Sequence, residues 1–260
     1  MKKVIVILLS FFLISCSKSN SRDEMSSFKI DLTSSVSNAT IDQPFKVIVS
    51  ANQSMKSMWI SYDNFATGGY ATRDFGYNFT LNFNFGAIGT KIISVRCQNQ
   101  NDEISEKQVV VNITRGTTVK ITGLQVISFF GINTSYDPEY GLTDPNRLAD
   151  LRFGFLKYRI DSSYDNTYNY GIWYLSPVIP NQGNMTWNFS NENLYIDPNV
   201  IFRFGLVDDD NGIGGADLLN GPPDYRELSF INYKATKPNQ ITYSFPEINL
   251  EVKLFVEWSN

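Results

Sequence analysis

Short runs in which apolar and polar residues alternate make up most of the chain beyond its N-terminal segment. In one run Phe45, Val47 and Val49 share a face, and in another Phe79, Leu81, Phe83 and Phe85 do so. A period of two residues is typical of a β-strand with one buried face. In the first half this pattern predicts strands over Phe28 to Leu32, Phe45 to Ala51, Met55 to Tyr62, Asn78 to Phe85, Lys91 to Cys97 and Gln108 to Ile113.

The end of the chain has the clearest alternation. Its apolar positions are Ile248, Leu250, Val252, Leu254, Val256 and Trp258. A helix would scatter these side chains around its axis, whereas a strand places them on one face. We therefore expect a closing strand here. Further strands are expected over Val119 to Phe130, Leu151 to Ile160, Tyr168 to Leu175, Met185 to Phe189, Val200 to Val207 and Arg226 to Ile231.

The strand pattern is interrupted at Arg115 to Thr118, which contains a glycine and two threonines. The chain of 260 residues is long enough for two domains. We therefore predict an all-β protein with two β-sandwich domains, at residues 28–114 and 119–260. The connection is short, so the two domains are expected to touch.

Composition and charge narrow the function classes. The net charge is −4 and becomes more negative without Lys2 and Lys3, which disfavours nucleic-acid binding. The sequence contains no histidine, which excludes Ser-His-Asp, Cys-His and histidine-metal chemistry. Any catalysis would have to rest on carboxylates, tyrosine, lysine or a carboxylate-held metal. A hydrolase with paired carboxylates is one such class, but nothing identifies a pair at a suitable separation. We predict that the protein is not an enzyme.

The N-terminus has the three parts of a bacterial secretion signal. Lys2 and Lys3 precede an apolar run from Val4 to Leu13, which is too short to span a bilayer. The following Leu13-Ile14-Ser15-Cys16 resembles a lipobox, the site at which a signal peptidase cleaves before a lipid-modified cysteine. This resemblance implies a signal peptide at 1–15, acyl chains on Cys16 and a polar, flexible tether over 16–27. More than one acyl chain gives stable membrane anchoring.

The residues around Cys16 also suggest a location. Ser17, rather than Asp, follows the cysteine, which resembles lipoproteins sorted to the outer membrane. The chain resembles Bacteroidota-type lipoproteins, some of which carry an acidic export signal, but here Asp23 and Glu24 come late. The side of the outer membrane is therefore left open. If Cys16 is lipidated, Cys97 is a lone thiol in a strand, and we expect it to be a buried packing residue.

The end of the first domain resembles the last two strands of immunoglobulin-like or polycystic-kidney-disease-type (PKD) domains. Gly89-Thr90-Lys91 leads into Ile92 to Val95, and a polar loop is followed by the valine-rich run from Gln108 to Ile113. The resemblance implies an Ig/PKD-like sandwich and says little about function, because such sandwiches serve many roles.

Acidic residues gather in the stretch from Leu206 to Gly221. Its aspartates stand among glycine and asparagine, and nearby carboxylates repel one another unless a cation or water screens them. Ca²⁺ takes six to eight oxygen ligands, and Gly212, Gly214 and Gly215 would let the backbone fold tightly enough to converge them. The alternatives are a calcium-holding loop and a solvated acidic turn. The aspartates concerned are Asp208, Asp209, Asp210 and Asp217.

Two segments of the second domain resemble the calcium loops of C2 domains. Asp137 followed by Gly141-Leu142-Thr143-Asp144-Pro145 resembles the first loop, and Asp208 to Gly221 resembles the third. The chain departs from the family pattern at Asn146 and Asn220. The resemblance implies a C2-like sandwich, with Asp150 and Asp209 as nearby substitutes for the ligands. The implied Ca²⁺ ligands are Asp137, Asp144, Asp208, Asp210 and Asp217.

Aromatic residues are dense enough to suggest either sugar stacking or simple packing. Within the first domain, Arg73 and Asp74 in the same region are interpreted as surface charges. The first domain contributes Trp59, Tyr62, Phe65, Tyr70, Phe75 and Tyr77, and the second contributes Tyr158, Tyr164, Tyr168, Tyr170, Trp173, Tyr174 and Trp187.

These observations predict a non-catalytic lipoprotein, anchored by Cys16, that acts as a binding or accessory module of the cell envelope. Ca²⁺ would stabilise the loops of its C2-like domain. The expected partners are the membrane, through the lipid, and an envelope protein or a glycan, with no role for nucleic acid. The alternative is a carbohydrate-binding component of a surface polysaccharide-uptake system.

Overall fold

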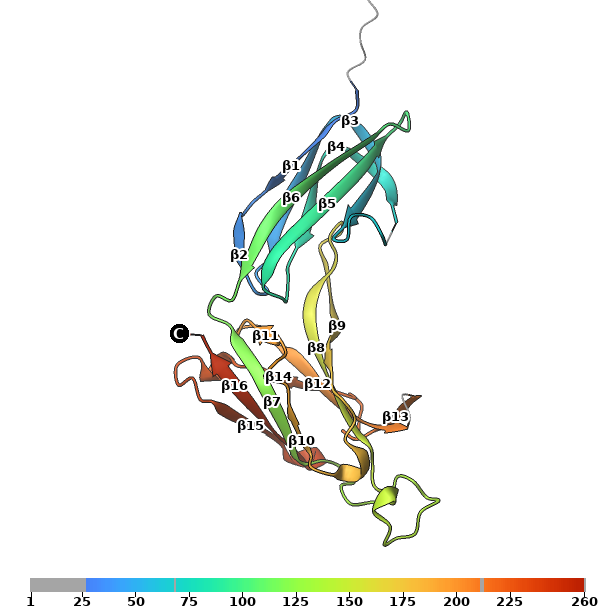
Figure 1. Cartoon of the computed structure of the whole chain (residues 1–260), viewed down its shortest axis with the longest axis vertical. Helices are drawn as coiled ribbons and strands as arrows, with labels where there is room; N and C mark the ends of the chain where they lie inside the picture. Colours follow the sequence, from blue (N-terminus) through green and yellow to red (C-terminus); the bar gives the residue numbers. More distant parts are fainter. Residues whose placement is uncertain (1–26, 68, 211–212, 260) are drawn as a thin grey trace, which may run out of the picture.

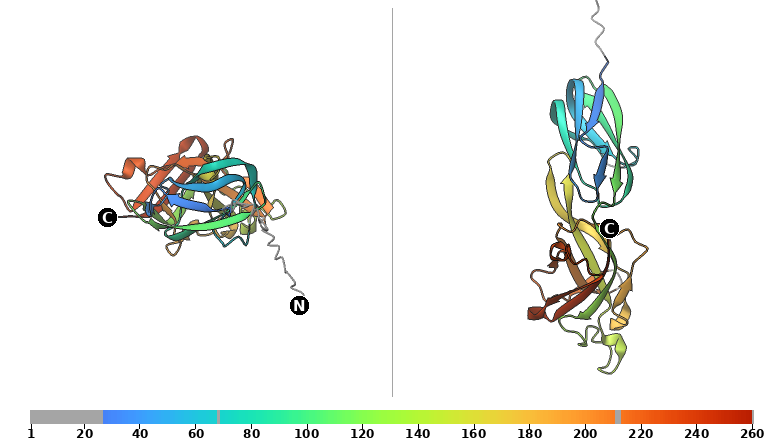
Figure 2. Two further views of the ribbon diagram at one scale, coloured as in Figure 1. Left: turned by 90° about the horizontal axis from the view of Figure 1, so that it is seen from above. Right: turned by 90° about the vertical axis from the view of Figure 1, so that its left-hand side faces the viewer.

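The protein is all-β, as its alternation predicts, and forms two domains placed end to end. The computed structural model describes residues 27–67, 69–210 and 213–259. The strands of one sheet all fall between Ile30 and Thr114, and those of two further sheets fall between Val119 and Trp258. Figures 1 and 2 show the first domain above the second, joined by a short connection and by a hairpin that reaches upward. No helix in the described part of the chain is long and apolar enough to cross a bilayer.

The first domain is one continuous six-stranded sheet that curls around its core. Its order is β1-β3-β5-β6-β2, with β4 also paired to β3. β3 is the central element, because its first half pairs with β1 and its second half pairs with β5. The strands are β1 (Ile30–Ser34), β2 (Asn38–Thr40), β3 (Phe45–Ser61), β4 (Ala71–Phe83), β5 (Gly89–Asn99) and β6 (Ile104–Thr114).

The core of the first domain follows the predicted alternation. Phe45, Val47 and Val49 are buried on β3, and Cys97 is a free, fully buried thiol on β5. Burial raises the pKa of the Cys97 thiol to about 12, so it stays protonated and acts as a small apolar side chain. The two strands expected over Phe45 to Tyr62 are a single strand, with a register shift between Ser50 and Met55.

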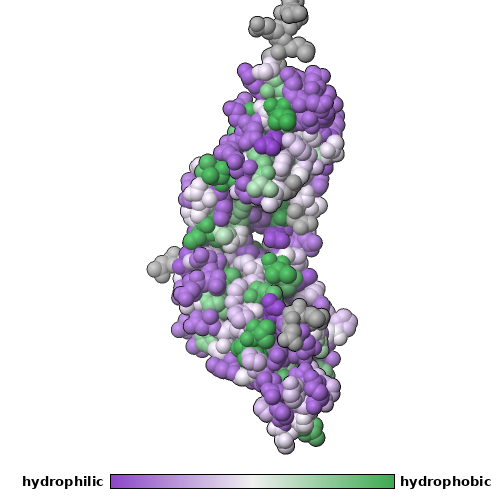
Figure 3. All heavy atoms as spheres, turned by 45° about the vertical axis from the view of Figure 1, so that its right-hand side comes forward, coloured by the Kyte–Doolittle hydropathy of each residue, from purple (hydrophilic) through white to green (hydrophobic). Residues whose placement is uncertain are grey.

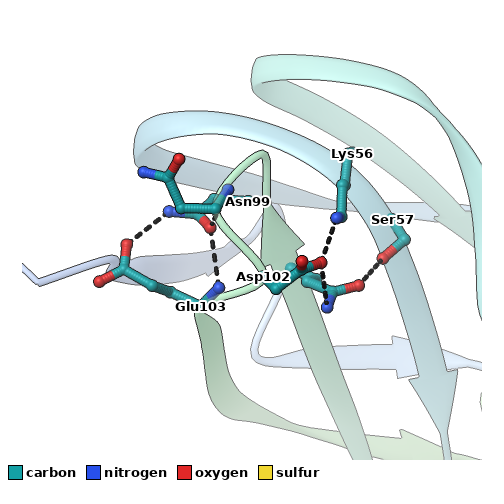
Figure 4. Close-up of polar contacts among 7 residues, drawn as sticks. Lys56, Ser57, Asn99, Asp102 and Glu103 are labelled. Atoms are coloured by element: carbon teal, nitrogen blue, oxygen red, sulfur yellow. Dashed lines mark hydrogen bonds and ion pairs between the residues drawn. The ribbon is translucent and has the colours of Figure 1, made fainter.

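A polar network ties the turn between β5 and β6 to β3 (Figure 4). The buried Asn99 donates from its side-chain amide to Gln53 Oε1 (2.7 Å) and Glu103 Oε2 (2.6 Å). Its own oxygen accepts the backbone N–H of Glu103. Lys56 forms an ion pair with Asp102. Every polar group of Asn99 thus has a partner, as a buried amide requires.

The second domain is a sandwich of two five-stranded sheets. One has the order β10-β7-β16-β15 with β11 on β7, and the other has the order β13-β12-β8-β9 with β14 on β12. Its strands are β7 (Val119–Ser128), β8 (Leu151–Ser162), β9 (Thr167–Leu175), β10 (Thr186–Asn188), β11 (Tyr195–Ile196), β12 (Phe202–Asp210), β13 (Ile213–Asp217), β14 (Arg226–Leu228), β15 (Gln240–Phe245) and β16 (Leu250–Trp258). Four short 3-10 helices complete it: η1 (Pro145–Arg147), η2 (Pro180–Gln182), η3 (Ile231–Tyr233) and η4 (Pro246–Ile248).

The closing strand confirms the clearest pattern in the sequence. Leu250, Val252, Leu254 and Val256 are buried on one face of β16, which lies between β7 and β15. β15 was not predicted, and neither was β13, whose residues were expected in a loop. The two sheets enclose one core rich in phenylalanine, including Phe153, Phe155, Phe202 and Phe204.

The β8–β9 hairpin extends beyond its own domain and packs against the first. Tyr164, near its tip, packs against the core of the first domain and donates its hydroxyl to the Met58 carbonyl (3.1 Å). Arg73 forms an ion pair with Asp165 (2.6 Å) and lies over the ring of Phe75. Arg73 is exposed, as the sequence interpretation expected, and it additionally forms an ion pair with a residue of the other domain.

A buried ion pair lies at the centre of this domain contact. Lys157 Nζ is 2.8 Å from Asp42 Oδ1, with side chains only 6% and 2% exposed. Lys157 also donates to the carbonyl of Tyr195 (3.1 Å), and the second oxygen of Asp42 accepts the N–H of Asp197 (3.1 Å). Burial raises the pKa of Asp42 and lowers that of Lys157, and their mutual attraction opposes both shifts.

Breaking this pair from one side should destabilise the protein strongly. Asp42→Asn tolerates the left-handed backbone at this position (φ 62°) but leaves Lys157 buried without a counter-charge. We expect a loss of about 3–5 kcal/mol in the free energy of unfolding, measured by urea denaturation. Lys157→Met should cost a similar amount, and the double variant should lose less than the sum. Single variants as stable as the wild type would show that the pair contributes nothing.

Candidate functional site

The predicted acidic residues lie at the end of the second domain that points away from the first (Figure 1). Asp208 is on β12, where Phe202, Phe204 and Leu206 all point into the core. By the alternation of the strand, Asp208 occupies the next inward position, and it is only 4% exposed. The strand therefore buries a carboxylate at the rim of an apolar core, next to the loop between β7 and β8.

Asp208 has no basic partner among the residues that the structure describes. Its Oδ1 accepts the backbone N–H of Asp150 (2.7 Å). Burial raises the pKa of its carboxyl to about 6, and the negative charges of Asp210, Asp137 and Asp150 add to the effect. The adjacent Asp209 is equally buried but forms an ion pair with Arg152 (2.7 Å). The charge of Asp209 is therefore compensated by Arg152, whereas the charged groups that act on Asp208 are all acidic.

The five predicted calcium ligands separate into two groups. Asp137, Asp208 and Asp210 form one group. The negative charge of Asp210 raises the pKa of Asp208, after burial, and that of Asp137, after burial and the charge of Glu139. Asp144 instead caps η1 by accepting the N–H of Asn146 (2.9 Å). Asp217 accepts the N–H groups of Leu219 (2.9 Å) and Gly221 (2.6 Å) in its own turn.

The described residues contain no group of three acidic or cysteine side chains arranged to hold a metal ion. Within the described residues, Gly214 and Gly215 lie in strand β13, because Ile213–Asp217 pairs with β12, whereas they were expected in a loop. Gly212, the third glycine of that prediction, lies outside the described residues. Gly215 lies against the carbonyl of Asp208, where a Cβ atom would collide with it. This glycine therefore permits a close approach of two strands at a register shift between Val207 and Asp209.

A second candidate site lies where the two domains meet. A cleft of about 590 Å³ is lined by both domains, and Figure 3 shows the surface hollowed at their junction. The first domain contributes Asp42, Tyr62, Asn84, Phe85, Gly86 and Ala87, and the second contributes Lys157, Arg159, Ile160, Gly171, Ile172, Trp173, Glu192, Asn193 and Leu194. Trp173 and Tyr62 were noted in the sequence as aromatic candidates, but no local pattern connects them.

Several of the other aromatic candidates pack inside the fold or against each other. Tyr174 and Trp187 pack in or against the core of the second domain, and Tyr164 packs against the core of the first. Tyr158 and Tyr168 stack on each other outside both cores, with ring centroids 5.3 Å apart. Their faces cover each other, which favours packing over sugar stacking for this pair.

The comparisons with known proteins concern architecture alone. No family model and no curated protein matches the chain. A PKD domain of an M14-like peptidase from a Thermoplasmatales archaeon is 13% identical, with a TM-score of 0.29, over 34% of this chain and 96% of its own. Fibronectin(III)-like modules of Clostridium thermocellum CbhA are 8% identical, with a TM-score of 0.27, over 76% and 93%. A putative membrane-anchored protein from Corynebacterium diphtheriae is 10% identical, with a TM-score of 0.25, over 78% and 59%.

The raised pKa of Asp208 makes a prediction about stability in metal-free buffer. Its pKa of about 6 in the folded protein exceeds the ordinary aspartate pKa of 3.8, so protonation favours the folded state. At neutral pH the ionised Asp208 therefore lowers the free energy of unfolding. This penalty disappears as the pH falls below about 4. Asp208→Asn, which keeps an acceptor for the N–H of Asp150, should raise the free energy of unfolding by about 1–2 kcal/mol at pH 7.5.

The measurement is urea unfolding of both proteins with chelator at pH 7.5 and pH 4. The gain from Asp208→Asn should shrink toward zero at the lower pH, where both side chains are neutral. Equal stabilities at pH 7.5 would show that the charge of Asp208 is already compensated in the folded protein.

Proposed function

We propose that the protein is a lipid-anchored, non-catalytic binding protein of the bacterial cell envelope, held at the outer membrane by Cys16. Cys16 and the tether up to residue 26 lie outside the described residues. The main support is where the fold begins: β1 starts at the end of the first domain that is far from the second (Figure 1). An anchor there would hold the second domain and the cleft away from the membrane.

A binding role agrees with the chemistry of the acidic side chains. Asp144 and Asp217 accept backbone N–H groups in their own turns, and Asp209 is paired with Arg152. Side chains with such structural partners are poorly placed to transfer protons to a substrate. The partner in this proposal is an envelope protein or a glycan, and the cleft between the domains favours a glycan.

We further propose a stabilising Ca²⁺ at the acidic end of the second domain. Its support is the buried Asp208, whose carboxyl pKa is raised by burial and by the negative charges of Asp210, Asp137 and Asp150. A hard divalent cation would relieve this repulsion with the oxygen ligands that it prefers. Because no three acidic side chains of the described residues are arranged to hold an ion, Asp137, Asp208 and Asp210 would converge on it only after a movement of the loop from Gly131 to Asp150.

Lipid anchoring is tested by replacing each of the two cysteines. In the native host the wild type should incorporate labelled palmitate and sediment with outer membranes, because acyl chains hold it there. Cys16→Ser should lose the label, and Cys97→Ala should keep it. Retention of both label and membrane association by Cys16→Ser would disprove the anchored function.

Calcium binding is tested on residues 17–260 by calorimetry and thermal unfolding, with Ca²⁺ or with chelator. At a Ca²⁺ concentration of about 100 times Kd, binding should stabilise the wild type by about 2.7 kcal/mol and raise Tm by a few degrees. Asp208→Asn with Asp210→Asn should abolish both effects. Asp217→Asn is the matched control, and it should still bind. Absence of heat and of a Tm shift in the wild type would rule out the ion.

A further inference from the structure

The cleft between the domains is built from parts that are distant in sequence. One wall is the turn after β4, with Asn84 and Phe85, and the other is formed by β8 and β9. Asn84 Oδ1 accepts the N–H of Ile160 (2.9 Å), so the walls are joined at one end by a hydrogen bond. The buried pair of Asp42 and Lys157 joins them at the floor. A cleft of about 590 Å³ with fixed walls lies within the usual range for small-molecule sites.

Two charged side chains in the cleft have no structural partner among the described residues. Arg159 and Glu192 are exposed, and neither makes an ion pair or a side-chain hydrogen bond with a residue in the described ranges. The guanidinium of Arg159 lies over Gly171, where a Cβ atom would meet its Cζ and Nη2 at 2.6 Å. Gly171 therefore leaves room for the guanidinium of Arg159 to lie across the strand.

Apolar surfaces in the cleft stand beside these polar groups. Tyr62 is 58% exposed although it packs edge-on against Phe85 (centroids 5.8 Å apart). Ile172 is 67% exposed on β9, and Trp173 forms part of the lining with Lys157 Nζ 4.4 Å from its ring centroid. Ligand clefts combine aromatic and aliphatic lining with a small number of polar groups, and this cleft has both.

The charges in the cleft balance. Asp42 and Lys157 neutralise each other, and Arg159 is matched by Glu192. A balanced site gives no electrostatic advantage to a polyanion such as nucleic acid. It suits a neutral ligand that carries many hydroxyl groups, because each hydroxyl both donates and accepts and can pair with a guanidinium, a carboxylate or an amide.

We propose that the cleft binds a neutral oligosaccharide, with Arg159, Glu192 and Asn84 pairing with its hydroxyl groups and Tyr62 and Trp173 contacting its C–H faces. This inference rests on the proposed function, since it names the ligand of the envelope binding protein. Gly171 lies directly below Arg159 and so determines the position of its guanidinium in the site. An extended peptide paired with the free edge of β9 is the competing occupant.

The test is isothermal titration calorimetry on residues 17–260. The probes are neutral gluco-, manno-, xylo- and galacto-oligosaccharides of six units, an acidic oligogalacturonide and a pool of extended peptides. We expect saturable one-to-one binding of at least one neutral series. Arg159→Ala and Glu192→Gln should each weaken that binding at least tenfold, the size of one charge-assisted hydrogen bond. Gly171→Ala should also weaken it, because the added methyl group displaces the guanidinium.

Matched controls are Lys107→Ala and Glu247→Gln, two exposed charges far from the cleft, which should bind as the wild type does. Unchanged melting temperatures would show that the cleft variants remain folded. Three results would overturn the inference: no neutral oligosaccharide binds, only the acidic sugar or the peptides bind, or Arg159→Ala and Glu192→Gln bind normally. If the wild type carries palmitate but binds no neutral oligosaccharide, this inference alone is contradicted. If the protein stays anchored without Cys16, the proposed function is contradicted.

Discussion

The buried pair of Lys157 and Asp42 determines how the two domains sit against each other. Removing two charges from water costs several kcal/mol each, and only close contact with a partner offsets that cost. A shift of one domain by a few ångströms would leave both charges buried and unpaired. Gly86 contributes to this geometry, because a Cβ atom there would lie 2.8 Å from Lys157 Nζ. The cleft walls take their positions from the same contact.

The strands could be predicted from the sequence because their signal is local. The period of two in β16 requires only that one face be buried, and Leu250 to Val256 provide it. The length of β3 could not be predicted in this way, since Gln53 and Ser54 interrupt its apolar pattern at a bulge. The role of Arg73 was hidden for another reason: Asp165, its partner, belongs to a hairpin of the other domain.

The two candidate sites differ in how much the sequence reveals. Aspartates in a glycine-rich stretch indicate either metal binding or turn formation, because the same carboxylate can accept backbone N–H groups. Asp144 and Asp217 do the latter, and only the inward direction of β12 separates Asp208 from them. Of the cleft, the sequence indicated only Tyr62 and Trp173, as two aromatic residues among many. The cleft residues are spread from Asp42 to Leu194, and only the domain contact brings them together.

The hairpin that inserts Tyr164 into the neighbouring domain has an evolutionary consequence. Modules of this architecture are often exchanged between proteins as independent pieces, which requires that each buries its own core. Here the first domain completes its core with Tyr164 and Tyr195 from the second, and the second relies on the first for the counter-charge of Lys157. A recombination event in the linker would expose apolar surface on one side and an unpaired charge on the other. Each domain therefore depends on the other for a complete core or a compensated charge.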